Sequence, residues 1–279
     1  MLHQESEAVH RRHELRPICA PAEVAPACRA LRLTLGRLPD RCDVFFGDQV
    51  PEEIGFAALV GGRRLKAIPS PVLDLGGLTW DDFLSARRAS RKRLRYLERR
   101  LESTHSVVYR CSTDPAALDR DLETLFELHR DRWGASTFSQ EEGFHRAFAP
   151  QALRVGWLRL WVQEIDGEPS AAWYGFRYGD AVSYYQSGRD PRWARESVGF
   201  LLLLRTIKAA IEEGAGTYRF LRGGEAYKLR LTADVPILET VGVALNMRGA
   251  LAVRVAAALS GDNGERLPRL YRRLAALAR

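Results

Sequence analysis

The sequence predicts an α/β protein with a mixed sheet, and three observations lead to this fold class. Stretches with strand periodicity alternate with longer stretches with helix periodicity over most of the 279 residues. Two tight turns, Asp166-Gly167 and Gly179-Asp180, separate three consecutive strands and predict an antiparallel meander. A helix and a further strand follow the meander, and this β-α-β order predicts a parallel strand pair.

The first 77 residues are predicted to contain two segments. Residues 1–40 mix charges, prolines and small residues without sustained periodicity, and we expect a mobile N-terminal segment there. Strands are predicted at 44–46, 56–60 and 65–68. Prolines and the pair Gly76-Gly77 then place a domain boundary near residue 77. The predicted domains are therefore 1–40, 41–77 and 78–279.

The main domain is predicted to contain helices and strands in a regular order. The predicted elements are a helix at 81–103, a strand at 106–111, helices at 115–133 and 140–148, strands at 155–165, 171–178 and 181–186, a helix at 197–213, a strand at 217–221, a short helical stretch at 225–230, a strand at 236–245, and helices at 248–259 and 267–278. Asp114 is a natural N-cap for the helix at 115–133. The strand at 236–245 is expected to complete the same sheet as the earlier strands.

Composition argues against several classes of protein. No apolar run approaches the roughly 20 residues that cross a bilayer, and the polar N-terminus lacks the apolar stretch of a signal peptide. We therefore expect a cytoplasmic protein without a transmembrane segment. The four cysteines include no CxxC pair and no histidine at zinc-ligand spacing, and His10-Arg-Arg-His13 lies in the expected mobile segment, so no metal site is expected.

The formal net charge of +7 is weak evidence for a polyanionic partner. Of the 42 basic residues only four are lysines, a bias typical of a GC-rich genome. The helix at 81–103 nevertheless carries eight basic residues between Arg87 and Arg100, while Leu94, Leu97 and Leu101 share one face. The basic face could serve RNA, a phosphate-bearing ligand or only solvent.

Two segments carry a more specific signal. They are Tyr184-Tyr-Gln-Ser-Gly-Arg-Asp-Pro191 and Phe220-Leu-Arg-Gly-Gly-Glu-Ala-Tyr-Lys-Leu-Arg230. Together with Leu128-His-Arg-Asp-Arg-Trp133 and the basic helix, they resemble the BioF2-like or CelD-like subgroup of the GNAT acyltransferase superfamily. This subgroup is similar to the Fem aminoacyltransferases and is linked to cell-envelope and cellulose biosynthesis. The resemblance covers about residues 65–245, and Leu231 stands where the family usually has tryptophan.

The resemblance implies a GNAT-like acyltransferase fold with a shortened N-terminal half. Members of the subgroup carry two GNAT-like halves, whereas only about 76 residues precede the expected boundary. Residues 41–77 would then be the remnant of a first half, and residues 78–279 the GNAT-like acyltransferase domain.

The resemblance also implies a donor site for acetyl-CoA or another acyl-CoA. In the GNAT fold the thioester lies where the fourth strand separates from the fifth. Its pyrophosphate binds the N-terminus of the intervening helix, where amide groups and the helix dipole favour an anion. The residues implied here are Gln186, Ser187, Arg195, Ser197, Val198 and Gly199. Because the phosphate loop is degenerate, a structural alternative makes Ser197 an N-cap and Gly199 a close-packing glycine.

The candidate catalytic residues are Glu225, Tyr227 and Lys228. Glu225 could accept a proton from the attacking amine, Tyr227 could protonate the leaving thiolate, and Lys228 could hold an anionic group. The implied substrate-binding residues are His129, Trp133, Tyr185 and Arg222. In the structural alternative Glu225 only forms an ion pair, and His129 is a core histidine on an apolar helix face.

The function implied is an N-acyltransferase that moves an acyl group from acyl-CoA to an amine acceptor, either a small molecule or a cell-envelope or polysaccharide precursor. Two alternatives stay open. One is a Fem-like transferase that uses aminoacyl-tRNA, with the basic helix following phosphates. The other is a non-catalytic module that binds a polyanion or a partner.

Overall fold

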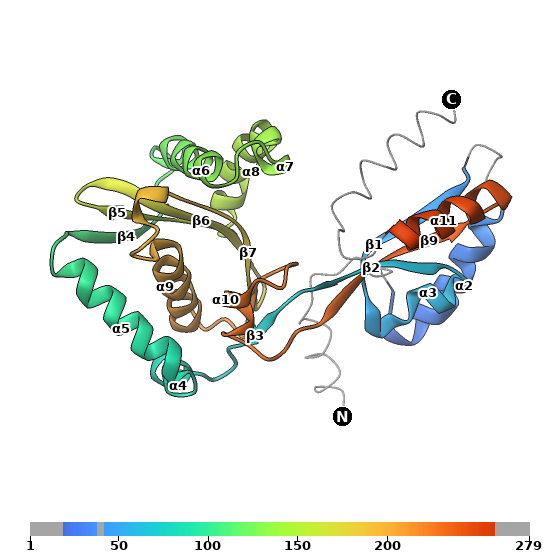
Figure 1. Ribbon diagram of the computed structural model, residues 1–279, viewed down its shortest axis with the longest axis horizontal. Coiled ribbons are helices and arrows are strands. Elements are labelled where there is room, and N and C mark those ends of the chain that lie inside the picture. Colours follow the sequence, from blue (N-terminus) through green and yellow to red (C-terminus); the bar gives the residue numbers. More distant parts are fainter. Residues whose placement is uncertain (1–18, 38–41, 260–279) are drawn as a thin grey trace. The chain divides into compact units, whose positions relative to one another are not determined.

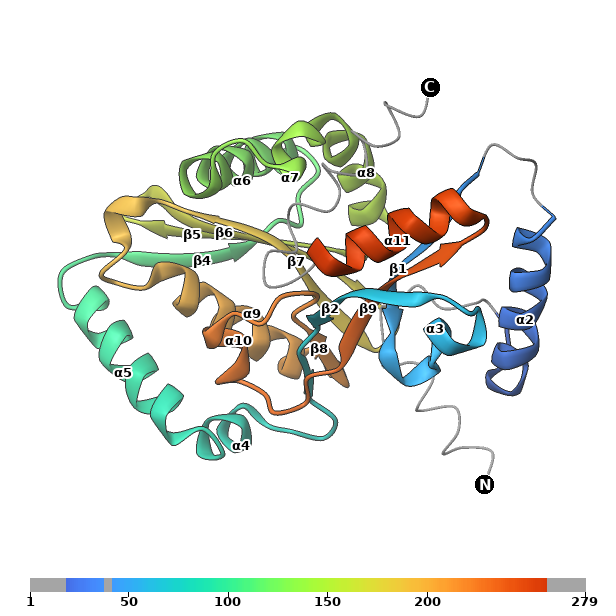
Figure 2. The same cartoon turned by 45° about the vertical axis from the view of Figure 1, so that its right-hand side comes forward.

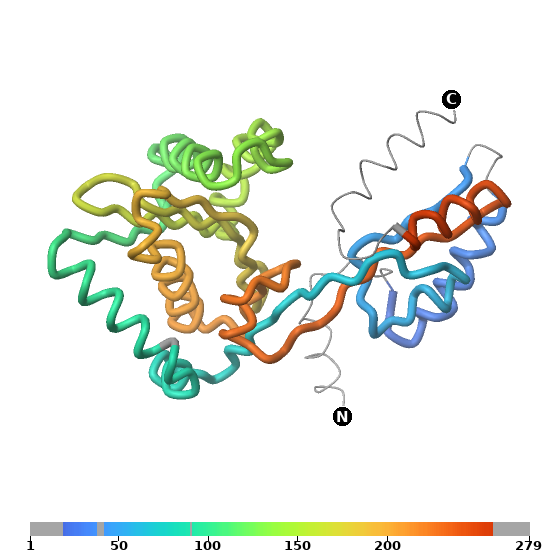
Figure 3. Tube along the Cα trace, in the orientation of Figure 1, coloured from blue at the N-terminus to red at the C-terminus, as the bar shows by residue number. Residues whose placement is uncertain are grey.

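The computed structural model describes residues 19–37 and 42–259, and the chain forms two compact units (Figure 1). The first unit comprises Pro71–Leu221 and Glu225–Asp234. The second comprises Arg222–Gly224 and, among the described residues, 19–37, 42–70 and 235–259. Between residues 71 and 234 the chain belongs to the first unit, apart from residues 222–224. Figure 3 traces the chain along the sequence. The histidines at positions 10 and 13 and the predicted helix at 267–278 lie outside the described residues.

The first unit is built on a six-stranded mixed sheet. Its strands, in spatial order, are β3 (Val72–Asp74), β8 (Thr217–Arg219), β7 (Ala181–Arg189), β6 (Glu168–Tyr178), β5 (Leu158–Ile165) and β4 (Val107–Cys111). Neighbouring strands are antiparallel except β7 and β8, which are parallel. The predicted antiparallel meander, now β5–β6–β7, and the predicted parallel pair are both confirmed.

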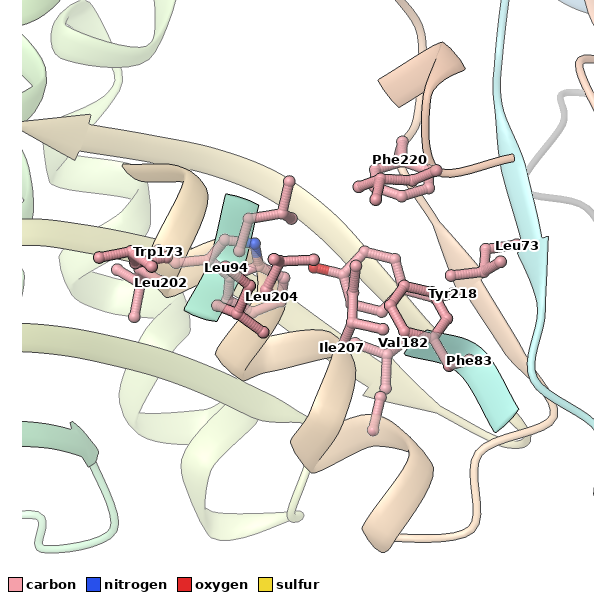
Figure 4. Close-up of a cluster of buried hydrophobic side chains, with 14 of the residues drawn as sticks. Leu73, Phe83, Leu94, Trp173, Val182, Leu202, Leu204, Ile207, Tyr218 and Phe220 are labelled. Atoms are coloured by element: carbon pink, nitrogen blue, oxygen red, sulfur yellow. The ribbon is translucent and has the colours of Figure 1, made fainter. Parts of the chain in front are cut away.

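Helices cover both faces of this sheet (Figure 2). One face carries α4 (Trp80–Ser85), α5 (Arg88–Glu102) and α9 (Val198–Glu212); the other carries α6 (Leu118–Trp133), α7 (Thr137–Gln140) and α8 (Glu142–Arg154). The 3-10 turn η3 (Pro191–Trp193) precedes α9, and α10 (Ala226–Leu229) follows β8. Figure 4 shows the core beneath α9, where Leu204 and Ile207 pack near Val182 and Tyr218.

The second unit is a small three-layer arrangement. Its antiparallel sheet has the order β1 (Val44–Pro51), β9 (Ile237–Ala244), β2 (Arg63–Pro69). The helical elements are η1 (Pro21–Glu23), α2 (Val24–Leu35), η2 (Glu52–Ile54), α3 (Phe56–Leu59) and α11 (Met247–Leu259). The helices α2 and α3 bury Cys28 and Phe56 against one face, and α11 buries Val253 against Leu65 on the other.

Three sequence-based expectations for these elements were wrong. The strand at 236–245 was expected in the large sheet but pairs as β9 with β1 and β2, because an alternating strand pattern does not identify its neighbours. The stretch predicted as a strand at 56–60 is the helix α3, since a short apolar run fits either state. Part of the expected mobile segment, residues 24–35, forms α2.

The predicted helix at 81–103 is divided into α4 and α5. The interruption is at Arg87, whose backbone leaves the helical region (φ −127°, ψ 59°) and whose Nε donates to the carbonyl of Leu231 at 2.7 Å. The predicted start of α6 is also displaced. Asp114 accepts from the amide of Ala116 in a turn, and the helix begins three residues later, at Leu118. That the 41–77 segment is the remnant of a first GNAT-like half stays a prediction.

A close approach between β7 and α6 fixes the helix on the sheet. A Cβ atom added at Gly188 would lie 2.4 Å from both the amide nitrogen of His129 and the carbonyl carbon of Leu128. Both of these atoms belong to the backbone and cannot rotate away. Glycine at this position therefore allows the end of α6 to lie directly against β7.

We expect Gly188→Ala to lower the free energy of unfolding by about 1–3 kcal/mol or more, because the methyl group forces β7 and α6 apart. Gly143→Ala is the matched control, since a Cβ there meets nothing within 4 Å in α8. That control should keep or raise stability by roughly 0.5–1 kcal/mol. Urea unfolding of both variants measures the difference, and equal stability of the two would contradict the close approach.

Candidate functional site

The strands β7 and β8 pair over only three positions. The pairs are Ala181–Thr217, Val182–Tyr218 and Ser183–Arg219, and β7 then continues alone on this side to Arg189. The expectation that the two strands are parallel and separate toward their carboxyl ends is therefore confirmed. Beyond Ser183, no strand in the described ranges 19–37 and 42–259 pairs with this edge of β7, so its backbone groups are not used in a strand ladder on that side.

Two irregularities of the backbone lie where the pairing ends. A bulge at Tyr185 interrupts the ladder with β6, since Tyr184 pairs with Gly175 and Gln186 with Tyr174. At the end of β8, Leu221 has a left-handed backbone (φ 55°), a strained conformation for a large side chain, which turns the chain away from β7. The separation thus coincides with irregular backbone geometry on both strands.

The bulge presents Tyr185 to the face that carries α7 and α8. Its ring is 38% exposed and lies 5.5–6.1 Å from the rings of Phe138, His145, Tyr174 and Phe176. The neighbouring Gln186 is half-buried. The structure therefore places Tyr185 at the rim of an aromatic cluster beside the separated strands.

The helix α9 follows β7 and η3, and Ser197 is the residue just before its first residue, Val198. Ser197 has a left-handed backbone (φ 56°) and its side chain does not cap the helix. Its hydroxyl instead accepts a hydrogen bond from Arg93 Nη2 at 3.3 Å, and the Arg93 guanidinium also lies 5.3 Å from the Phe200 ring centroid. The alternative in which the Ser197 side chain caps the helix is therefore not supported. The guanidinium of Arg93 lies at the N-terminus of α9.

Gly199 does not fill a tight space. A Cβ there would meet only the Cδ of Arg189, at 3.5 Å, which is ordinary contact. The close-packing alternative is thus not supported either. Val198 is buried, whereas Arg195 is exposed in the turn before the helix. The first-turn amides of an α-helix have no acceptor within the helix, so this turn fits an anionic group.

Ser187 is the centre of a hydrogen-bond network beyond the paired part of β7. Its hydroxyl lies 2.5 Å from the hydroxyl of Tyr184 and accepts from Arg132 Nη1 at 3.0 Å. Its carbonyl lies 3.1 Å from His129 Nδ1, while His129 Nε2 lies 2.9 Å from the hydroxyl of Ser136. Because both ring nitrogens have protein partners and the ring is buried, His129 matches the core-histidine alternative.

The motif after β8 places Glu225, Tyr227 and Lys228 on and before α10. The Glu225 carboxylate lies 2.9 Å from Lys228 Nζ; half of the Glu225 side chain is exposed, whereas that of Lys228 is buried. Burial lowers the pKa of Lys228, and the ion pair opposes this effect. The Tyr227 hydroxyl is hydrogen-bonded to Tyr184, and burial raises its pKa strongly.

The remaining predicted site residues, Trp133 and Arg222, are both exposed. Trp133 is 55% exposed and carries the Arg132 guanidinium over its ring at 4.4 Å. Arg222 is exposed and lies in the segment that belongs to the second unit. Sequence reasoning missed Arg93, Arg132 and Tyr184 as site residues, although all three lie in motifs that carried the family resemblance.

The helix α5 exposes a basic face. Leu94, Leu97 and Leu101 are buried against the domain as expected. A shallow hollow along the helix is lined by Arg88, Arg91, Lys92, Arg95, Tyr96, Arg99 and Arg100. Arg88, Arg95 and Arg99 are exposed, while Arg91 is half-buried.

Within residues 19–37 and 42–259, no group of three or more His, Cys, Asp or Glu side chains is arranged to hold a metal ion. In the same ranges, no helix is both long enough and apolar enough to pass through a bilayer.

The fold and the site define an α/β domain for acyl transfer, in which a parallel strand pair separates beside a helix N-terminus. Residues 88–229, more than half of the chain, match the family model described as acetyltransferase (GNAT) domain. The chain therefore belongs to this family and is an acyltransferase. No curated protein matches the sequence.

Solved structures show the same fold at low sequence identity. FemX superposes with a TM-score of 0.56 at 11% identity, over 82% of this chain and 79% of FemX. L-PGS from Bacillus licheniformis superposes with a TM-score of 0.53 at 12% sequence identity, over 78% of this chain and 73% of L-PGS. A conserved protein of unknown function from Bacteroides thetaiotaomicron superposes with a TM-score of 0.54 at 14% sequence identity, over 80% of this chain and 76% of that protein. These identities support the fold alone.

The buried imidazoles of His129 and His145 should make stability depend on pH. Burial lowers the pKa of both below the ordinary value of about 6.5. The folded state then disfavours protonation of the two rings. Their contribution to the free energy of unfolding is therefore complete above about pH 6.5 and is lost as the pH falls through the lowered pKa. We expect His129→Gln and His145→Gln each to reduce the slope of the free energy of unfolding against pH. Urea unfolding between about pH 7.5 and 5 measures it, and an unchanged slope in both variants would contradict the prediction.

Proposed function

We propose that this protein is an N-acyltransferase that moves the acyl group of an acyl-CoA to an amine acceptor. The observation that carries the proposal is the separation of β7 from β8 beside the open first turn of α9. The acceptor would be a small amine or an amine on a cell-envelope or polysaccharide precursor, and the reaction would take place in the cytoplasm.

The first turn of α9 supports a phosphate-bearing donor. Gly199 leaves its backbone accessible, and Arg93 and Arg189 add positive charge beside the helix dipole. Ser197, Val198 and Gly199 would hold the pyrophosphate, with Arg195 at the exposed rim. The acyl end would then lie along Gln186 and Ser187, on the unpaired edge of β7.

The reaction proposed is direct transfer within a ternary complex. The amine nitrogen attacks the thioester carbonyl carbon, a C–N bond forms, the C–S bond breaks and coenzyme A leaves as a thiolate. Glu225 takes the proton of the attacking amine directly or through one water, and the thiolate takes up a proton from the site or from solvent. The protein contributes mainly positioning and hydrogen bonds to the developing oxyanion.

The raised pKa of Tyr227 refines its proposed role. A phenol with a raised pKa stays protonated and donates a hydrogen bond, but it releases its proton less readily. Tyr227 would therefore stabilise the leaving thiolate by a hydrogen bond rather than by full proton transfer. Lys228, held by Glu225, would position that carboxylate.

Glu225→Gln should lower kcat by roughly 10²-fold or more with donor affinity nearly unchanged, because glutamine keeps the shape but cannot accept the proton. Glu212→Gln is the matched control, since Glu212 forms a similar pair with Lys208 at 3.6 Å on α9. Steady-state kinetics and thermal melts separate the outcomes: a Glu225→Gln variant that loses only stability would assign Glu225 to a structural ion pair.

Aminoacyl-tRNA is the second candidate donor, and the basic face of α5 favours it. Titration calorimetry with acetyl-CoA, longer acyl-CoAs and tRNA distinguishes the two donors. Binding of acyl-CoA but not tRNA supports the first proposal, and the reverse supports the Fem-like reaction. Binding of tRNA without transfer of any acyl group would leave a non-catalytic polyanion-binding module.

If tRNA binds along α5, replacing Arg88, Arg91, Arg95 and Arg99 with glutamine should weaken binding and flatten its salt dependence, because each lost phosphate contact lowers the slope by about one. The matched control is a variant with the same change of charge at four exposed arginines elsewhere, namely Arg120, Arg154, Arg248 and Arg254. Equal effects of the two variants would assign the binding to net charge alone.

A further inference from the structure

Three hydroxyl groups are linked at the unpaired edge of β7. Ser187 and Tyr184 lie on β7 with their oxygens 2.5 Å apart, and Tyr227 from α10 is hydrogen-bonded to Tyr184. Ser187 pairs across the ladder with Trp173, which belongs to the core beneath α9. The network therefore joins the open end of β7 to the motif that follows β8.

Arg132 brings a positive charge to this network from the opposite helix layer. It extends from the last turn of α6, donates to the Ser187 hydroxyl at 3.0 Å and stacks on Trp133. Side chains of both helix layers can meet here because, in the part of the chain that the structure describes, β7 has no second neighbouring strand beyond Ser183. The charge of Arg132 acts on its surroundings, since it contributes to the lowered pKa of His129 and opposes the rise in the pKa of Tyr227.

This guanidinium lacks the counter-ion that its neighbour has. Arg130, two residues earlier, pairs with Glu123 at 3.2 Å and with Glu142 at 2.5 Å. Among the residues that the structure describes, no carboxylate lies within 4 Å of the half-buried Arg132. Partial burial of a cation without a counter-ion costs free energy, and a bound anion would offset this cost.

We infer that Arg132 and the hydroxyls of Ser187 and Tyr184 form a subsite for a carboxylate, and that the acyl acceptor is an amine that carries one, such as an amino acid or a short peptide with a free carboxyl terminus. The part that concerns the acceptor rests on the proposed function. The planar guanidinium matches a carboxylate in two parallel hydrogen bonds, and a single cation suits a singly charged group.

The charges around the tyrosine pair agree with such a ligand. Arg132 and the Glu225 carboxylate act on the Tyr227 hydroxyl with opposite sign. A molecule with a carboxylate and an amine can direct its carboxylate to Arg132 and its amine to Glu225. This orientation brings the amine to the residue that the proposed reaction uses as base.

Binding without a donor tests the subsite independently of catalysis. Saturation-transfer NMR on the full chain compares matched probes, namely L-alanine with L-alaninamide, and glycylglycine with glycylglycinamide. The wild-type protein should bind the carboxylates in preference to the amides, with an apparent Kd for the amides at least about tenfold higher. Equal binding of acid and amide, or no detectable binding of any probe, would overturn the inference.

Variants then locate the preference. Arg132→Met should remove it, and Arg132→Lys should keep it only in part because an ammonium lacks the planar fork. Arg120→Met is the control, since Arg120 lies on the same helix and is largely exposed. A preference that survives in a folded Arg132→Met variant would overturn the assignment. If that variant does not fold, an undiminished preference in both Ser187→Ala and Tyr184→Phe would overturn it instead.

Turnover separates this inference from the proposed function. With any donor that supports transfer, Arg132→Met should raise the acceptor KM by about 10- to 100-fold and leave the donor KM unchanged. Carboxylate binding through Arg132 without transfer from any acyl-CoA or aminoacyl-tRNA would contradict the proposed function and retain the subsite. Transfer that prefers amines without a carboxylate would contradict the acceptor inference and retain the function.

Discussion

The early end of the parallel pairing between β7 and β8 is the constraint on which the rest of the site depends. Two parallel strands that paired along their full length would satisfy each other's backbone groups and leave no place for a ligand. Here the bulge at Tyr185 bends one strand, and the left-handed backbone of Leu221 turns the other away. The core beneath α9 stabilises both distortions, since Val182 and Tyr218 pack under the helix before the strands separate.

The unpaired edge lets two helix layers contribute to one site. The layer with α9 supplies a helix N-terminus, with Arg93 beside it, where the proposed donor would bind. The layer with α6 supplies Arg132, and Gly188 allows that helix to approach β7 closely enough for the contact with Ser187. Donor and acceptor groups can thus be held by different layers and meet at one strand.

Charge at the motif after β8 is arranged as an opposed pair. Lys228 is buried, and its ion pair with Glu225 compensates for the loss of solvent. The carboxylate is half-exposed and so stays within reach of a substrate. The basic face of α5 is different in kind, because its apolar residues are buried in the core and only charge and Tyr96 remain for a partner.

The sequence by itself determined the order of elements in the first unit, the meander, the parallel pair and the family. These follow from local periodicity, from turns at Asp166-Gly167 and Gly179-Asp180, and from contiguous motifs. It also identified Ser187, Tyr227 and the residues that begin α9 as candidate site residues. Only the tertiary structure decided which sheet receives the strand at 236–245, because identical strand patterns can pair with different neighbours. It alone brought Arg132 of α6 to Ser187 of β7, 55 residues apart, since that contact depends on the close packing at Gly188 and on a strand edge left without a partner.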